Sequence, residues 1–215
     1  MQTRILTIEE IREVYEKYLY YDFPDDERKP LSRIEQSIRE GRYLCTGAFA
    51  EDGGFLAYAF FVFEKDVCLL DYYAVVPEMR GQGIGSEFLR RAVEQCGSEV
   101  TIIEIEDPES EVPEEEKKAR ERRLDFYLQA GAINTNVHVL VFGVEYLLLE
   151  YPLKGIHNEE AIAEGYGIAM EKMQATLDAS RNATEKPSLT GALKENAEKV
   201  KAQPAKSAGK NEQSL

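Results

Sequence analysis

The sequence has no tryptophan, and its 215 residues include only two histidines and three cysteines. Cys45, Cys68 and Cys96 are scattered and odd in number, which predicts free thiols in a reducing compartment rather than a disulfide framework. Neither His138 nor His157 stands in a spacing typical of a metal site or of the partner of a cysteine nucleophile. We therefore expect no metal ion and no catalytic cysteine.

Long apolar runs and an excess of basic charge are also missing. No segment approaches the ~18 consecutive apolar residues of a membrane helix, and no signal peptide is apparent at the N-terminus, so we expect a cytoplasmic protein without a membrane partner. Lysine and arginine number 26 against 40 acidic residues, for a formal net charge of -14. This balance argues against a nucleic-acid partner. It permits a cationic substrate, although solubility explains it more simply.

Composition changes towards the end of the chain. Residues 181–215 contain no aromatic residue and few large aliphatic ones, which predicts a disordered polar tail. Apolar residues at spacings of three and four within residues 156–180 predict a C-terminal helical extension. Residues 1–155 are therefore expected to form a single folded domain.

Within that domain, the hydrophobic patterns predict a mixed α/β fold with one central, mostly antiparallel sheet flanked by helices. Thr7 and Glu10 have the spacing of a helix capping box. The expected strands cover residues 3–6, 43–50, 55–63, 67–76, 100–106, 137–142 and 146–151, and the expected helices begin near residues 7, 31, 86 and 118.

A glycine-rich segment joins the apolar strand at 67–76 to the helix that follows it. The segment is Arg80-Gly81-Gln82-Gly83-Ile84-Gly85-Ser86, and Pro77 ends the strand before it. Glycines allow a tight turn, and the unpaired amides at the start of a helix bind phosphate groups. The segment lacks the Gly-Lys-Ser/Thr ending of a loop that binds nucleoside triphosphates. A plain helix start remains the alternative.

Residues 74–85 resemble the acetyl-CoA motif of the GNAT N-acetyltransferase superfamily, Arg/Gln-x-x-Gly-x-Gly/Ala, which Arg80, Gly83 and Gly85 match. The order of elements from residue 3 to about residue 151 is similar to that family's fold. The resemblance implies acetyl-CoA as co-substrate. It also implies backbone pairing of the pantetheine arm with the strand and pyrophosphate binding at the turn. The implied cofactor-binding residues are Tyr73, Ala74, Val75, Arg80, Gly81, Gln82, Gly83, Ile84, Gly85 and Ser86.

Three carboxylates are candidates for the base that amine acylation requires. Glu104 and Glu106 alternate with Ile103 and Ile105, so both side chains share one face of the strand. Glu104 resembles the strand glutamate that serves as base in some members of the superfamily. Asp71 is a third candidate, because it interrupts an apolar strand. For Glu104, an exposed position on an outer face is the alternative.

Residues 124–132 resemble the Phe-Tyr-x-x-x-Gly-Phe segment of the same superfamily. The resemblance implies that Tyr127 lies close to the sulfur as general acid. Tyrosine, with a reference pKa near ~10, is protonated at neutral pH and can donate. The alternative is a core aromatic on an amphipathic helix.

The sequence departs from the family pattern after the strand at 100–106. Residues 107–110 replace an asparagine that the family often has there, and the following link is long and acidic. We expect Arg120, Arg122 and Arg123 on an exposed helix face. The alternatives are an acidic lip that attracts a cationic amine, or basic side chains near the cofactor's phosphates.

The resemblance predicts an N-acetyltransferase that moves an acetyl group from acetyl-CoA to a primary amine by direct attack in a ternary complex. A non-catalytic acyl-CoA-binding or assembly module with the same fold is the alternative. The sequence does not identify the amine, which is a small molecule or a peptide. The C-terminal helix is expected either to cover the domain or to support a homodimer.

Overall fold

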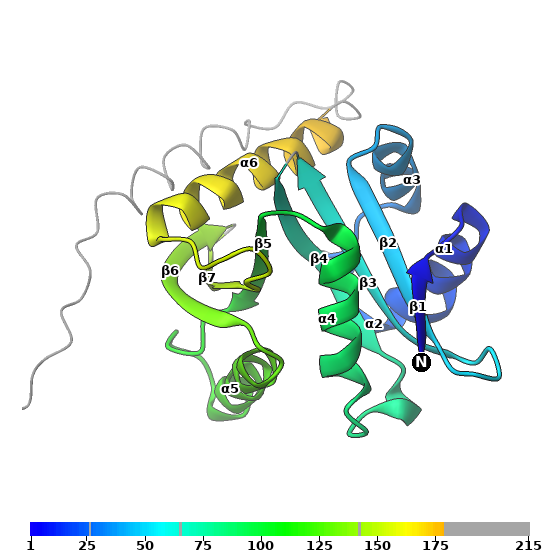
Figure 1. The fold of residues 1–215 in the computed structure, drawn as a ribbon. Helices are drawn as coiled ribbons and strands as arrows, with labels where there is room; N and C mark the ends of the chain where they lie inside the picture. Colours follow the sequence, from blue (N-terminus) through cyan, green and yellow to red (C-terminus); the bar gives the residue numbers. More distant parts are fainter. Residues whose placement is uncertain (26, 65, 142, 179–215) are drawn as a thin grey trace, which may run out of the picture.

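The computed structural model describes residues 1–178 except residues 26, 65 and 142 (Figure 1). Its centre is a seven-stranded sheet with the order β1-β2-β3-β4-β5-β7-β6. All neighbouring strands are antiparallel except β4 and β5, which are parallel. The predicted mixed, mostly antiparallel sheet flanked by helices is thus confirmed. The predicted tail at 181–215 lies outside the described residues.

The strands are β1 (Gln2–Ile5), β2 (Tyr43–Phe49), β3 (Phe55–Glu64), β4 (Val67–Val75), β5 (Val100–Glu106), β6 (Ile133–Val141) and β7 (Val144–Glu150). The helices are α1 (Ile8–Val14), the π-helical turn η1 (Tyr15–Leu19), α2 (Tyr20–Asp22), α3 (Leu31–Arg39), the 3-10 turn η2 (Pro77–Met79), α4 (Ile84–Cys96), α5 (Glu114–Gln129) and α6 (Glu159–Asp178).

Helices cover both faces of the sheet, and side-chain alternation along the strands assigns residues to each face. In β3, Ala57, Ala59 and Phe61 belong to the core under α4 and α5, whereas Tyr58 and Phe60 belong to the core under α1 and α3. Helix α6 lies on the same face as α1 and α3, over β3 to β6. The sheet therefore separates an α4–α5 face from an α1–α3–α6 face.

Two helix predictions need correction. Helix α5 begins at Glu114, four residues earlier than expected, since Pro113 and three glutamates suit the positive end of a helix. The helix predicted from Thr7 does begin there with the expected capping box, but it widens into a π-helical turn at Tyr15–Leu19. Apolar spacing alone does not distinguish that wider turn from an α-helix.

The structure places the three cysteines and limits the length of the helices. Cys45 and Cys68 are buried, and all three cysteines are free thiols. Within the described residues, no helix combines the length and the apolar character needed to cross a bilayer.

Candidate active site

The two parallel strands β4 and β5 pair over only half of their length. Their register runs from Val67 opposite Val100 to Leu70 opposite Ile103 and then stops, although β4 continues to Val75 and β5 to Glu106. The β3–β4 register skips Asp71, which is a β-bulge at the same level. A bulge bends its strand and ends pairing. We call the opening between β4 and β5 beyond this level the split.

Beyond the bulge, β4 has a strand partner on one side only. Tyr73, Ala74 and Val75 pair with β3, while the register with β5 has already ended. Main-chain groups on the open side are therefore available to an extended ligand that adds to the edge. The Val75 carbonyl already accepts a hydrogen bond of 3.0 Å from Arg80 Nε. Arg80 also lies 3.5 Å from Asp22 Oδ1, so its guanidinium sits at the end of β4.

The glycine-rich turn after β4 has the predicted geometry. Gly81 and Gly83 have φ angles of 75° and 77°, and a Cβ at either position would meet nothing within 4 Å. Backbone conformation, rather than space, therefore favours glycine at both positions. Glu87 N donates to Gly83 O at 3.4 Å, and the amides of residues 81–86 donate to no other described residue. Six successive amides are thus left for an anion.

Gly85 has a different role from the other two glycines. A Cβ there would lie 3.0 Å from Phe126 Cε2, so the missing side chain allows α4 and α5 to approach each other. The Gly85 carbonyl accepts a hydrogen bond of 2.6 Å from the Tyr73 hydroxyl. The Tyr73 ring stacks on Phe88 at a centroid distance of 5.8 Å. Tyr73 therefore packs its side chain in the core while its backbone borders the split.

Tyr127 lies on the α4–α5 face, with its ring centroid 6.4 Å from that of Tyr73. The side chain is buried, as the core-aromatic alternative predicts. Its hydroxyl makes no hydrogen bond with any described residue. Burial raises the pKa of Tyr127 to about 12, against a small lowering by Arg123. The hydroxyl therefore stays protonated at neutral pH and is free to donate.

Glu104 lies on the opposite, α1–α3–α6 face, where β5 leaves β4. It is partly buried, and its Oε2 accepts a hydrogen bond from the Tyr166 hydroxyl of α6. Among the described residues it has no ion-pair partner. Burial raises the pKa of Glu104, and the Tyr166 hydrogen bond partly opposes that shift. A carboxylate with a raised pKa suits a general base.

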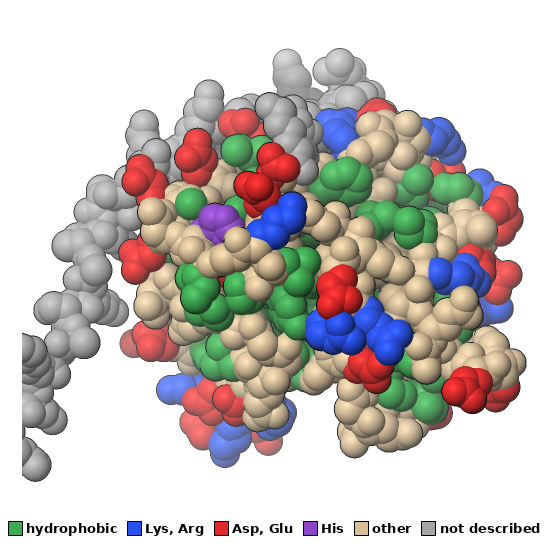
Figure 2. Space-filling view, viewed as in Figure 1, with side chains coloured by type: hydrophobic (Ala, Val, Ile, Leu, Met, Phe, Trp, Pro, Cys, Tyr) green, Lys and Arg blue, Asp and Glu red, His purple; other side chains and the backbone are tan. Residues whose placement is uncertain are grey.

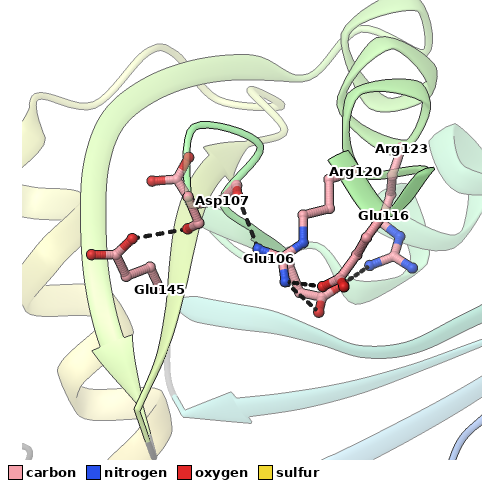
Figure 3. Close-up of polar contacts among 7 residues, drawn as sticks. Glu106, Asp107, Glu116, Arg120, Arg123 and Glu145 are labelled. Carbon is pink, nitrogen blue, oxygen red and sulfur yellow. Dashed lines mark hydrogen bonds and ion pairs between the residues drawn. The ribbon is translucent and has the colours of Figure 1, made fainter. Parts of the chain in front are cut away.

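Glu106 shares that face of β5, but two arginines neutralise it (Figure 3). Arg120 Nη2 lies 3.3 Å from Glu106 Oε1, and Arg123 Nη1 lies 2.9 Å from Oε2. Arg120 also binds Glu116 at 2.6 Å and the Asp107 carbonyl at 3.0 Å. Such pairing favours a structural role for Glu106 over that of a base.

The prediction that Arg120 is exposed is therefore wrong, whereas Arg122 and Arg123 are exposed as predicted. Arg120 is buried because acceptors from the β5–α5 link surround its guanidinium, and only such pairing makes a buried charge tolerable. Two of those acceptors lie 13 and 14 residues away in the sequence, beyond any helical spacing.

Asp71 is also paired. Its Oδ1 lies 2.5 Å from Lys29 Nζ, and its Oδ2 accepts a hydrogen bond from the Tyr43 hydroxyl. Of the three carboxylates that the sequence singled out, Glu104 alone makes no ion pair with a described residue. Lys29, Tyr43 and Tyr166 gave no local sequence signal, because each reaches its carboxylate from a distant segment.

The position where the family often has asparagine is occupied by the buried Asp107. Its carboxylate accepts from the Glu109 amide at 2.8 Å and lies 2.6 Å from His138 Nδ1. The side chain therefore fixes the link instead of facing the split. Within the described residues, no group of three or more histidine, cysteine or acidic side chains is placed to hold a metal ion.

A cavity of about 580 Å³ lies elsewhere, between the start of β6, the end of β7 and the start of α6. Its wall includes the buried Glu150, which accepts a 3.0 Å hydrogen bond from the His157 amide. None of the residues at the split lines this cavity. On the face drawn in Figure 2, acidic and basic side chains are intermixed over the surface. We place the candidate site at the split, where the free amides and the unpaired carboxylate lie.

Comparison with known proteins gives one family and a set of similar structures. The model of the acetyltransferase (GNAT) family matches residues 8–112. A putative GNAT-family acetyltransferase from Bacteroides thetaiotaomicron is 19% identical, with a TM-score of 0.61 over 77% of this chain and 93% of that one. No curated protein matches the sequence.

Two further similar structures have names that state the molecule each enzyme acetylates. The ribosomal-protein-S18-alanine N-acetyltransferase from Escherichia coli is 16% identical, with a TM-score of 0.51 over 74% of this chain and 96% of that one. A spermidine N-acetyltransferase from Vibrio cholerae, in complex with CoA and spermine, is 10% identical, with a TM-score of 0.51 over 69% and 93%. At these identities the likeness establishes the fold.

Proposed function

Residues 8–112 place the chain in the acetyltransferase (GNAT) family, and on that premise we propose that it transfers an acetyl group from acetyl-CoA to a primary amine. One observation carries this proposal: six amides with no acceptor among the described residues follow the unpaired edge of β4 after the short turn η2. A ligand with a pyrophosphate joined to an extended amide-containing arm fits both features at once.

The chain's own residues fit such a ligand. Backbone groups of Tyr73, Ala74 and Val75 would pair with the pantetheine arm, and the amides of residues 81–86 would bind the pyrophosphate. Arg80, which is more than half exposed, would add a cation beside it. When bound, acetyl-CoA supplies the thioester whose acetyl group is transferred.

Glu104 is the base in this proposal. Its Oε1 makes no hydrogen bond with a described residue, so that oxygen is available to the incoming amine or to a water between them. A primary amine is protonated at neutral pH and must lose a proton before direct attack in a ternary complex. The raised pKa of Glu104 brings its proton affinity closer to the working pH.

Tyr127 would act from the other face of the sheet as donor to the leaving sulfur. Its pKa of about 12 lies well above the ~8.5 of a thiol. The hydroxyl therefore stabilises a developing thiolate by a hydrogen bond more readily than by complete proton transfer. The amine would attack the thioester carbonyl from one face, and the thiolate would leave on the other as the carbon–sulfur bond breaks.

The acceptor class rests on the chemistry of the α1–α3–α6 face and on the fold relatives. Two similar structures are named for the acetylation of amines, spermidine in one and a protein's alanine in the other. Both names support a primary amine as acceptor for this chain, without selecting between a small molecule and a peptide terminus.

Thiol release from acetyl-CoA, measured with a panel of polyamines, amino-sugar amines, lysine peptides and free peptide termini, tests the proposal. We expect one class to release thiol in proportion to acetylated amine identified by mass spectrometry. Calorimetry with acetyl-CoA serves as the parallel measurement. Binding without turnover across the whole panel would contradict the enzyme and favour a non-catalytic acyl-CoA-binding module.

A further inference from the structure

We propose that the C-terminal helix α6 belongs to the active site, and that Tyr166 is a positioning residue that holds the Glu104 carboxylate at the split. This inference rests on the proposed role of Glu104 as base. Helix α6 (Glu159–Asp178) lies entirely outside residues 8–112, which match the family. The family match itself therefore assigns no role to this helix.

Helix α6 is anchored over the sheet by one apolar stripe. Ile162, Ala169 and Met170 are buried at helical spacing and pack in a core that includes Ile102 and Leu148. Tyr166 is the polar member of this stripe, only 4% exposed. The helix contacts β3, β4, β5 and β6, so it crosses the sheet over both strands that border the split (Figure 1).

The Tyr166 hydroxyl forms a hydrogen bond with the Glu104 carboxylate. It donates to Oε2, and no second oxygen or nitrogen of the described residues hydrogen-bonds to the Glu104 carboxylate. One carboxylate oxygen is therefore held while the other stays available for an amine. Burial raises the pKa of Tyr166 well above its ordinary value, so the phenol remains a permanent donor rather than a second titrating group.

The surroundings of Glu104 make this single hydrogen bond important. Lys29 and Glu27 approach from the segment before α3, Asp71 from β4 and Tyr146 from β7. Lys29 is already paired with Asp71. The cation that acts on Glu104 is thus shared with Asp71, and among the described residues the Tyr166 hydroxyl is the only group that hydrogen-bonds to the Glu104 carboxylate. The ordered carboxylate would otherwise rotate or take up a proton.

Tyr166→Phe tests the inference because it removes the hydroxyl and keeps the ring. A hydrogen bond to a charged acceptor is worth roughly one pH unit in the pKa of that acceptor. We expect the acid limb of the kcat/KM profile for the amine to move up by about one unit. Turnover below that limb should fall roughly tenfold, and the affinity for acetyl-CoA should not change. An acid limb that coincides with the unmodified protein's would overturn the inference.

Direct titration of the Glu104 carboxyl gives a second readout that does not depend on turnover. Carboxyl resonances of glutamate-labelled protein would be followed by NMR, with Glu104→Gln used to assign the signal. The midpoint should rise in Tyr166→Phe by the same amount as the acid limb. An unmoved midpoint rejects the contact even if no amine is acetylated, whereas a moved midpoint with an inactive protein rejects the proposed function alone.

Tyr146→Phe is the matched control. Tyr146 lies near Glu104, but its hydroxyl makes no hydrogen bond with a described residue, so its loss should move the midpoint by much less than that of Tyr166. Urea unfolding of both variants separates packing from positioning. Equal shifts in the two variants would show that Tyr166 acts only through local polarity and would contradict the proposal.

Discussion

The two faces of the sheet contribute different chemical groups to the split. On the α4–α5 face the site consists mainly of backbone: six free amides, two glycines in left-handed conformation and one tyrosine hydroxyl. On the α1–α3–α6 face it consists of side chains: three carboxylates with lysine, arginine and tyrosine partners. Binding and chemistry are thus built from different parts of the polypeptide.

The three carboxylates of the α1–α3–α6 face, which we call the carboxylate face, also differ from one another in their partners. Asp71 and Glu106 are compensated by cations, whereas Glu104 is compensated by a neutral phenol. Compensation by a cation favours the charged form, and burial without one disfavours it. We therefore expect the reactive carboxylate to be Glu104, whose negative charge has no cation paired with it among the described residues. The following substitutions test this contrast, first between the carboxylates and then between the faces.

Glu104→Gln should have the largest effect. Loss of a positioned base lowers turnover by roughly 10²–10⁴-fold, while acetyl-CoA affinity, carried by the other face, should remain. Steady-state kinetics and calorimetry measure the two quantities separately.

Glu106→Gln is the matched control, a carboxylate two residues along the same strand face. Because two arginines already neutralise Glu106, we expect lower stability but less than about tenfold loss of turnover. A larger loss for Glu106→Gln than for Glu104→Gln would reverse the assignment of the base.

Tyr127→Phe should lower turnover by about 10²-fold, the lower end of the cost of removing one donor from a developing charge. The KM for the amine should stay the same, since the amine approaches on the other face. Tyr151→Phe, another buried tyrosine of the α4–α5 core, is the control and should keep turnover within a factor of two or so. Full activity in Tyr127→Phe would leave that residue as a core aromatic only.

Arg120→Met tests whether the ion pairs of Arg120 with Glu106 and Glu116 stabilise the fold. The Arg120 side chain is only 6% exposed, but Glu106 and Glu116 are 31% and 46% exposed, so solvent screens the pairs. We expect the free energy of unfolding in urea to fall by about 2 kcal/mol, below the range for fully buried pairs. Arg122→Met, at an exposed position of the same helix, should change it by less than about 0.5 kcal/mol. Equal effects would mean that the network adds nothing specific.

The sequence predicted the backbone features on the α4–α5 face better than the side-chain partners on the other face. The glycine-rich turn was predictable because its determinants are local: Gly81 and Gly83 stand within four residues of the helix they begin. The approximate positions of the strands along the chain were readable for the same reason, since alternation and turn residues are short-range signals. The family resemblance added the prediction that Tyr127 lies close to the sulfur.

The partners on the carboxylate face were not predictable. Tyr166 lies 62 residues from Glu104, and Lys29 lies 42 residues from Asp71. In the sequence, Tyr166 is only one more member of an apolar stripe, and Arg120 is one of several basic residues on a helix. Which charges are compensated depends on tertiary contacts. The sequence offered three candidate carboxylates, and the structure pairs two of them, Asp71 and Glu106, with cations.

Gly83→Ala should have the smallest effect and tests the backbone face directly. A Cβ at φ 77° costs about 1–2 kcal/mol, which corresponds to roughly tenfold weaker acetyl-CoA binding if the protein relieves the strain by moving the turn. Gly41→Ala is the matched control, because Gly41 has φ 69°, equally open surroundings and a position just after α3, away from the turn. Both variants should lose similar stability, but only Gly83→Ala should lose affinity in calorimetry. Equal affinity in the two would show that the amides of residues 81–86 do not bind the cofactor, and the division of labour between the two faces would then be wrong.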